Sequence, residues 1–170
     1  YRIVVDDFGL KYNILRMLRT RECDVIAVPA GSTAEEVLAH SPDGVVLSPG
    51  PGDPELLDYA VDTAKGLVGR LPILGICLGN QVLARALGGK NFKLKFGHRG
   101  ANHPVRDLST GLVHITAQNH GYAVEAESLP PELERSHGRL KDGTVKGLRD
   151  RSEPLMSIRC RSEASPGALH

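Results

Sequence analysis

The first half of the chain alternates between short apolar runs and stretches in which apolar residues recur at helical spacing. The runs predict strands at residues 2–5, 24–28, 44–47 and 71–74. The spaced stretches predict helices over about 10–21, 32–40, 55–68 and 81–87. Ser32 and Glu35 have the spacing of a capping box, which predicts Ser32 as the N-cap of the second helix. Strands and helices that alternate with short turns predict a doubly wound, mostly parallel sheet with helices on both faces.

The second half of the chain has a different pattern. Short apolar segments linked by polar turns predict strands at 92–96, 113–117, 122–124 and 155–158. We interpret these strands as a mixed or antiparallel extension of the same α/β domain. No internal repeat or linker divides the sequence, so residues 1–170 are expected to form a single domain.

Composition narrows the class of protein. The chain has 170 residues, of which 41% are hydrophobic and 24% charged, with a net charge of +1, as in ordinary globular domains. No basic stripe indicates a nucleic-acid partner, and no apolar run or signal peptide indicates a membrane. Cys23, Cys77 and Cys160 are too scattered for a disulfide framework or a zinc site, so we expect a cytoplasmic protein without a metal. The chain begins at Tyr1, at the start of a strand, and is therefore expected to be a piece of a longer protein.

Cys77 stands out among the three cysteines. It lies between Gly75 and Gly79, after a predicted buried strand and before a predicted helix. A nucleophile elbow has this form, since a tight turn lifts one side chain above the strand ends. The free N–H groups of a helix N-terminus also stabilise negative charge on a sulfur placed there. The alternative is a buried structural cysteine, but the two glycines favour the nucleophile.

The loop after the third predicted strand contains Gly50, Pro51 and Gly52. It could be only a turn, or it could bring backbone N–H groups close to a ligand oxygen. It is not a phosphate-binding P-loop, because the Lys-Ser/Thr ending is missing. Ligand sites lie at the carboxyl ends of parallel strands, so we expect this loop to face Cys77.

A cysteine beside free N–H donors is equipped for acyl transfer. Cys77 would attack a carbonyl, and the N–H of Leu78 with a glycine N–H would hold the oxyanion. Such a nucleophile also needs a base that accepts and returns a proton, and a carboxylate that orients the base.

Four motifs occur in a family-specific order, at residues 48–54, 75–81, 116–122 and 163–167. They resemble those of the class I glutamine amidotransferases, which have a flavodoxin-like fold. The run from Lys95 to Pro104 makes the chain similar to the amidotransferase domain of the carbamoyl-phosphate synthase small chain. The resemblance covers nearly the whole chain, and it implies an amino-terminal domain and a last helix that this sequence does not include.

This resemblance implies a glutaminase. Cys77 would form a glutamyl thioester from glutamine, and the ammonia would pass to the large subunit, the partner that makes carbamoyl phosphate for arginine or pyrimidine synthesis. The domain itself would need no cofactor, since the large subunit uses the ATP. Seven residues match the family's glutamine-contacting positions: Gly50, Gly52, Leu78, Gln81, Asn119, Gly121 and Tyr122. Without the resemblance, Asn119 and Gly121 would indicate a hairpin turn.

The sequence departs from the family where the base is expected. Glu163 matches the family's carboxylate, but Arg161 stands at the position of the histidine, and Asn80 replaces another common histidine. Arginine has no acceptor and stays protonated, so it cannot take a proton from Cys77. Loss of general acid–base help typically costs about 10²–10⁴-fold in rate. His120 is the best candidate for a substitute base.

Several departures from the family pattern lie close together in the sequence, near residues 159–170. They are consistent with local decay, deliberate alteration or a sequence error. Two functions remain open: a working glutaminase domain, and a catalytically impaired module that is a structural or regulatory partner of the large subunit. A third, an amidotransferase for anthranilate or guanine nucleotide synthesis, is disfavoured by the run from Phe96 to Pro104.

Overall fold

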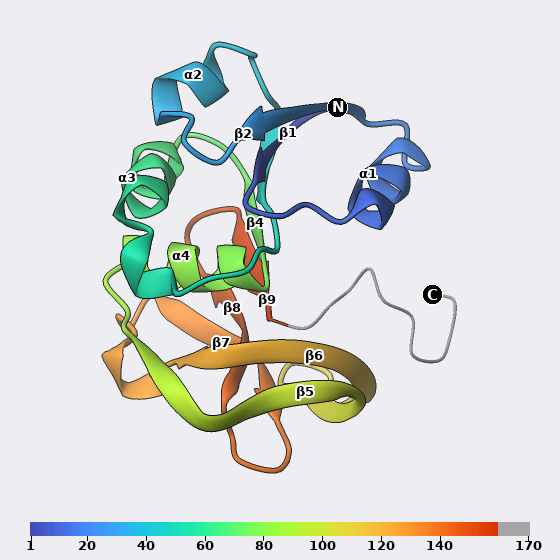
Figure 1. The fold of residues 1–170 in the computed structure, drawn as a ribbon, viewed down its shortest axis with the longest axis vertical. Helices are drawn as coiled ribbons and strands as arrows, with labels where there is room; N and C mark the ends of the chain where they lie inside the picture. The colour runs from blue at the N-terminus through green and yellow to red at the C-terminus, as the bar shows by residue number, and fades with distance from the viewer. Residues whose placement is uncertain (160–170) are drawn as a thin grey trace.

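The computed structural model describes residues 1–159, and these form a single mixed sheet flanked by helices (Figure 1). The strand order is β2-β1-β3-β4-β9-β8-β7-β5-β6. The strands are β1 (Arg2–Asp7), β2 (Asp24–Pro29), β3 (Gly44–Leu47), β4 (Ile73–Ile76), β5 (Asn91–Asp107), β6 (Val113–Val124), β7 (Leu133–Arg139), β8 (Val145–Asp150) and β9 (Leu155–Ile158). The helices are α1 (Tyr12–Arg19), α2 (Ala34–Leu38), α3 (Asp58–Leu67) and α4 (Leu78–Ala86), with short 3₁₀ turns at Pro54–Leu56 and Ala126–Ser128.

One half of the sheet is parallel and doubly wound, as the sequence predicts. Strand β1 pairs with β2 and β3, β3 pairs with β4, and β4 pairs with β9, all in parallel. Figure 1 shows α1 on one side of these strands and α2 and α3 on the other. The main apolar core includes Val37 of α2, Leu67 of α3 and Val82 of α4, and the smaller core beneath α1 includes Ile14.

The other half of the sheet is antiparallel and larger than expected. Strand β5 continues well beyond residue 96, and the segments 113–117 and 122–124 belong to one strand, β6. Strands β7 and β8 were not predicted, because their polar residues hide the two-residue period. Strand β9 was expected in the extension, but it pairs in parallel with β4 on one side and antiparallel with β8 on the other.

Two local expectations need correction. Helix α2 begins at Ala34, so the capping box joins Thr33 and Glu36 and not Ser32 and Glu35. The carbonyl of Ser32 accepts a hydrogen bond of 2.9 Å from the Thr63 hydroxyl instead. Helix α4 starts at Leu78, directly after Cys77, rather than at residue 81.

Candidate active site

Cys77 occupies a strained turn between β4 and α4. Its backbone has φ 54° and ψ −102°, and it is the N-cap residue of α4. Positive φ is rare for a residue with a side chain and marks stored strain, as in a nucleophile elbow. The N–H of Cys77 donates a hydrogen bond of 2.8 Å to the carbonyl of Ile158 in β9, which fixes the turn against the next strand. The predicted elbow is therefore confirmed.

The two glycines around Cys77 are explained by close backbone contacts. A Cβ on Gly79 would lie 2.1 Å from the carbonyl oxygen of Leu47 in β3, and one on Gly75 would lie 2.7 Å from the carbonyl oxygen of Gly79. Real Cβ atoms do not approach backbone this closely, so both positions need glycine. This close packing lets α4 begin immediately after β4.

Two positions of the loop after β3 require glycine. A Cβ on Gly50 would lie 2.3 Å from the carbonyl oxygen of Phe8, so this residue must be glycine for the loop to rest on the end of β1. Gly52 has φ 112°, a conformation that also requires glycine. Beyond the loop, Asp53 Oδ2 accepts a hydrogen bond of 2.6 Å from the Tyr122 hydroxyl in β6.

One cavity of about 350 Å³ brings the loop, the elbow and β6 together. Cys77 and the Gly50–Gly52 loop both line it, as expected for residues at the carboxyl ends of neighbouring parallel strands. All seven residues that the resemblance assigns to substrate line the same cavity: Gly50, Gly52, Leu78, Gln81, Asn119, Gly121 and Tyr122. Residues from three distant segments of the chain thus converge on one thiol.

The cavity presents free hydrogen-bonding groups. Leu78 is the first residue of α4, so its N–H has no acceptor within the helix. Gln81 lies one turn later, and its buried Nε2 has no hydrogen-bond partner among residues 1–159. Asn119 and Gly121 lie within β6, so the alternative of a hairpin turn is wrong.

A family model described as glutamine amidotransferase class-I matches residues 4–168. The chain belongs to the class-I glutamine amidotransferase family. The chain is also 58% identical over 168 residues to the carbamoyl phosphate synthase small chain of Symbiobacterium thermophilum, covering 98% of this chain and 46% of that relative. The corresponding protein of Staphylococcus haemolyticus is 54% identical over 97% of this chain and 45% of its own length. The amidotransferase domain described here therefore spans about half the length of these relatives.

Solved structures support the fold. A candidate GMP synthase protein from Thermoplasma acidophilum superposes with a TM-score of 0.82 at 23% identity, over 96% of this chain and 85% of its own. A glutamine amidotransferase from Thermotoga maritima gives 0.75 at 18% identity, over 95% and 76% of the two chains. At these sequence identities, the structural similarity supports only the α/β fold. This fold agrees with the doubly wound sheet that the sequence predicts.

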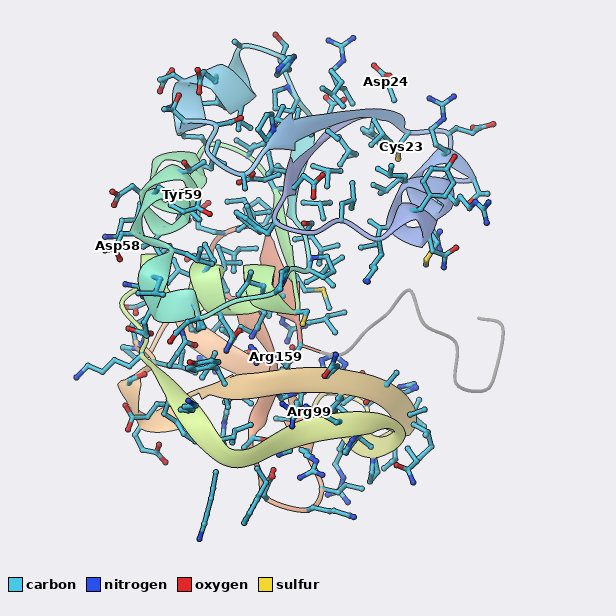
Figure 2. The ribbon with its side chains drawn as sticks, in the orientation of Figure 1. Cys23, Asp24, Asp58, Tyr59, Arg99 and Arg159 are labelled. Carbon is cyan, nitrogen blue, oxygen red and sulfur yellow. The ribbon has the colours of Figure 1, made fainter. Side chains whose placement is uncertain are left out.

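Three residues of interest lie outside the described part of the domain. They are Cys160, Arg161 and Glu163. The predicted base position and its carboxylate are therefore not placed relative to Cys77. Cys23, in contrast, lies beside α1, far from the labelled Arg159 (Figure 2).

His120 lines the cavity, but its surroundings do not suit a base. Its Nδ1 lies 3.0 Å from the Tyr122 carbonyl oxygen, and its Nε2 lies 3.1 Å from Lys146 Nζ. Burial, together with the positive charges of Arg159 and Lys146, lowers the pKa of His120 to about 2. Both ring nitrogens are thus engaged and protonation is unfavourable, which argues against His120 as the substitute base.

Three cationic residues of the cavity wall were missed by the sequence analysis: Lys93, Arg99 and Arg159. Arg159 is 1% exposed and donates a hydrogen bond to the carbonyl of Tyr122. Figure 2 shows Arg159 and Arg99 beside the β5–β6 ribbon. For Arg159, the sequence offered one signal of a role in the site: it is a charged residue that directly follows the predicted strand 155–158.

Within residues 1–159, no group of three or more His, Cys, Asp and Glu side chains is arranged to hold a metal ion. None of the helices in this part of the chain is long and apolar enough to cross a bilayer. The chemistry that the cavity offers comes from its thiol, its amides, its backbone N–H groups and its cations.

Proposed function

We propose that residues 1–170 form the glutamine-hydrolysing domain of a carbamoyl phosphate synthase small chain. The observation that carries this proposal is Cys77, a strained elbow thiol that shares one cavity with the glycine loop and the polar residues of β6. The relatives at 58% and 54% identity bear the name carbamoyl phosphate synthase small chain, which specifies the amidotransferase.

In the proposed reaction, Cys77 Sγ attacks the side-chain carbonyl carbon of glutamine. A C–S bond forms and the C–N bond breaks, and the departing nitrogen takes up the proton that the Cys77 thiol loses and leaves as ammonia. The N–H of Leu78, together with a loop N–H from Gly50 or Gly52, would hold the oxyanion. Water then attacks the thioester, releases glutamate and restores the thiol.

The remaining residues would bind and orient the substrate. Gln81 would offer its Nε2, which has no hydrogen-bond partner among residues 1–159, to the polar end of glutamine, and Asn119 lines the same cavity. Gly121 and Tyr122 allow β6 to approach the ligand closely. Glu163 would supply the carboxylate of the proton relay, and Arg161 stands where that relay needs a histidine. Ammonia would pass to a synthetase large subunit, which uses the ATP, in the cytoplasm.

The test combines the chain with a carbamoyl phosphate synthase large subunit. We expect glutamine to support carbamoyl phosphate formation, and Cys77→Ser to abolish this without changing the rate with free ammonia. Retention of glutamine-dependent synthesis by Cys77→Ser would overturn the nucleophile assignment. Cys23→Ser is the matched control, because that thiol lies outside the cavity.

A second candidate function rests on Arg161 alone. With a cation where the base is expected, the domain would serve as a non-catalytic partner of the large subunit. This function is indicated if the complex assembles and uses ammonia but not glutamine, while Arg161→His gains the use of glutamine. Glutamine use by the unaltered chain would exclude it.

A further inference from the structure

Arg159 is the largest fully buried side chain among residues 1–159, and it borders the cavity that contains Cys77. It follows β9 directly, and the last residue of β9, Ile158, accepts the hydrogen bond from the Cys77 N–H. The guanidinium is therefore held beside the elbow by the strand pairing that fixes the elbow itself. Nη2 donates to the carbonyl of Tyr122 in β6.

The guanidinium has unused donors. Nε and Nη1 are buried and have no hydrogen-bond partner within the described residues. A buried cation without an anionic partner is costly, because it has lost its hydration and gained little in return. An anion that enters the cavity would meet donors that need no rearrangement of other hydrogen bonds.

Within residues 1–159, the groups around Arg159 do not neutralise its charge. Lys146 is fully buried and contacts the rings of His98 and His120. Burial, with the neighbouring positive charges, lowers the pKa values of these two histidines to about 4 and about 2. Both imidazoles are therefore uncharged at neutral pH. Lys93 and Arg99 add positive charge to the cavity wall.

Acidic groups near the cavity are already engaged. Asp142 accepts from Arg139 at 2.6 Å and lies 3.0 Å from His98 Nε2. Asp53, at the edge of the loop, accepts from the Tyr122 hydroxyl. The described part of the cavity is thus positively charged around the thiol.

The sulfur of Cys77 and the guanidinium also interact directly through their charges. Burial lowers the pKa of Arg159 to about 10, and a negative charge on Cys77 opposes this decrease. Negative charge that develops at the sulfur, or on a ligand atom beside it, is therefore stabilised by Arg159.

A carboxylate suits these donors better than an amide does. A guanidinium binds a carboxylate through parallel, charge-assisted hydrogen bonds, which are about twice as strong as neutral ones. We propose that Arg159 makes the end of the cavity beside Cys77 a carboxylate site, so that the cavity retains the dicarboxylic amino acid L-glutamate. This inference rests on the proposed function, in which glutamate is the product. Its α-amino and α-carboxyl groups occupy the same end of the cavity as those of glutamine, and its side-chain carboxylate meets Arg159.

Calorimetric titration of the chain with L-glutamate and with L-glutamine tests the proposal. Arg159→Gln is expected to weaken glutamate binding about tenfold or more and to change glutamine binding less than about threefold. Arg159→Lys, which keeps the charge but loses the parallel bonds, is expected to bind glutamate with an affinity between those of the unaltered chain and Arg159→Gln. Arg19→Gln, at an exposed position of α1 outside the cavity, is the matched control for the loss of one positive charge. Unchanged glutamate affinity in Arg159→Gln, or the same loss in Arg19→Gln, would overturn the proposal.

A second measurement needs no substitution at Arg159. Alkylation of Cys77 by iodoacetamide is followed in the unaltered chain with L-glutamate or with its uncharged γ-methyl ester. Glutamate is expected to protect the thiol at a concentration about tenfold lower than the ester; equal protection overturns the carboxylate site. Arg159-dependent binding of glutamate without binding of glutamine would uphold this site and refute the glutaminase, so the two failures are distinguishable.

Discussion

The hydroxyl of Tyr122 donates a hydrogen bond of 2.6 Å to Asp53 Oδ2, and this bond joins β6 to the loop that follows β3. It raises the pKa of Tyr122 and lowers the pKa of Asp53, the directions expected when a carboxylate accepts from a phenol. Asp53 Oδ1 meanwhile accepts from the N–H of Glu55. The wall of the cavity is therefore closed by a contact between residues that are 69 positions apart.

Tyr122→Phe removes this bond and keeps the ring. We expect the KM for glutamine to rise roughly 2–10-fold, the usual worth of one hydrogen bond, while kcat changes less. Steady-state glutaminase kinetics measure both. Tyr59→Phe, on the exposed surface of α3, is the control and should leave both constants unchanged. A fall in kcat with constant KM would show that the bond acts on chemistry and not on the loop.

Gly79→Ala tests the packing of the elbow. The new Cβ would lie 2.1 Å from the Leu47 carbonyl oxygen, so α4 must move away from β3. We expect a loss of about 1–3 kcal/mol in unfolding free energy, measured by urea denaturation, and a large loss of Cys77 alkylation rate. Gly31→Ala is the control, because nothing lies within 4 Å of a Cβ there. Wild-type stability in Gly79→Ala would contradict the close approach.

Arg161→His tests the proton relay. The unaltered chain should bind glutamine and turn it over slowly, because arginine cannot accept the proton of Cys77. Histidine at this position is expected to raise kcat by about 10²-fold or more, with a smaller change in glutamine affinity. The comparison uses steady-state kinetics and equilibrium binding of the two chains. Equal turnover by both would show that the relay does not depend on residue 161.

Asp6 makes the stability of the fold depend on pH. Both carboxylate oxygens are buried in β1 without a hydrogen-bond partner among the described residues, and burial, with a smaller contribution from Asp7, raises the pKa to about 7. The folded chain therefore keeps a proton that the unfolded chain releases near 3.8. The contribution of Asp6 to the free energy of unfolding should therefore fall as pH rises from about 4 to about 7 and then level off, by up to about 4 kcal/mol at about 1.4 kcal/mol per pKa unit. The buried imidazoles of His98 and His120, whose pKa values are lowered, contribute in the opposite direction, so the Asp6 contribution is the difference between the unaltered chain and Asp6→Asn.

Urea denaturation between pH 4 and pH 9 measures this dependence. The stability of Asp6→Asn relative to the unaltered chain should rise between pH 4 and pH 7, so that Asp6→Asn is the more stable chain at pH 8. The exposed Asp62→Asn is the control and should keep the pH dependence of the unaltered chain. A difference between Asp6→Asn and the unaltered chain that stays constant with pH would show that Asp6 does not titrate in this range.

The sequence predicted the parallel half of the fold because its strands are continuous apolar runs. It also predicted that Cys77 faces the glycine loop, since both follow such strands and carboxyl ends share an edge. Strand β7 was missed because its only buried residue is Leu133, and its register is set by pairing with β5 and β8.

Arg159 shows why local pattern has limits at the site as well. In sequence it is a cation after a short strand, typical of an exposed turn. Its burial beside Cys77 follows from the pairing of β9 with β4, which joins residues about 80 positions apart. No pattern within the sequence of β4 or of β9 predicts that Arg159 lies beside Cys77.

Strand β9 also sets the order in which the molecule can be completed during biosynthesis. It is last of the described strands along the chain, yet it lies between β4 and β8 and pairs with both. A nascent chain that has not yet released residues 155–158 from the ribosome holds two separate sheets with unpaired edges. Cys77 is synthesised early, but the carbonyl of Ile158 that accepts its N–H arrives only with the last described strand. The turn at Cys77 is thereby completed only after residue 158 has been translated.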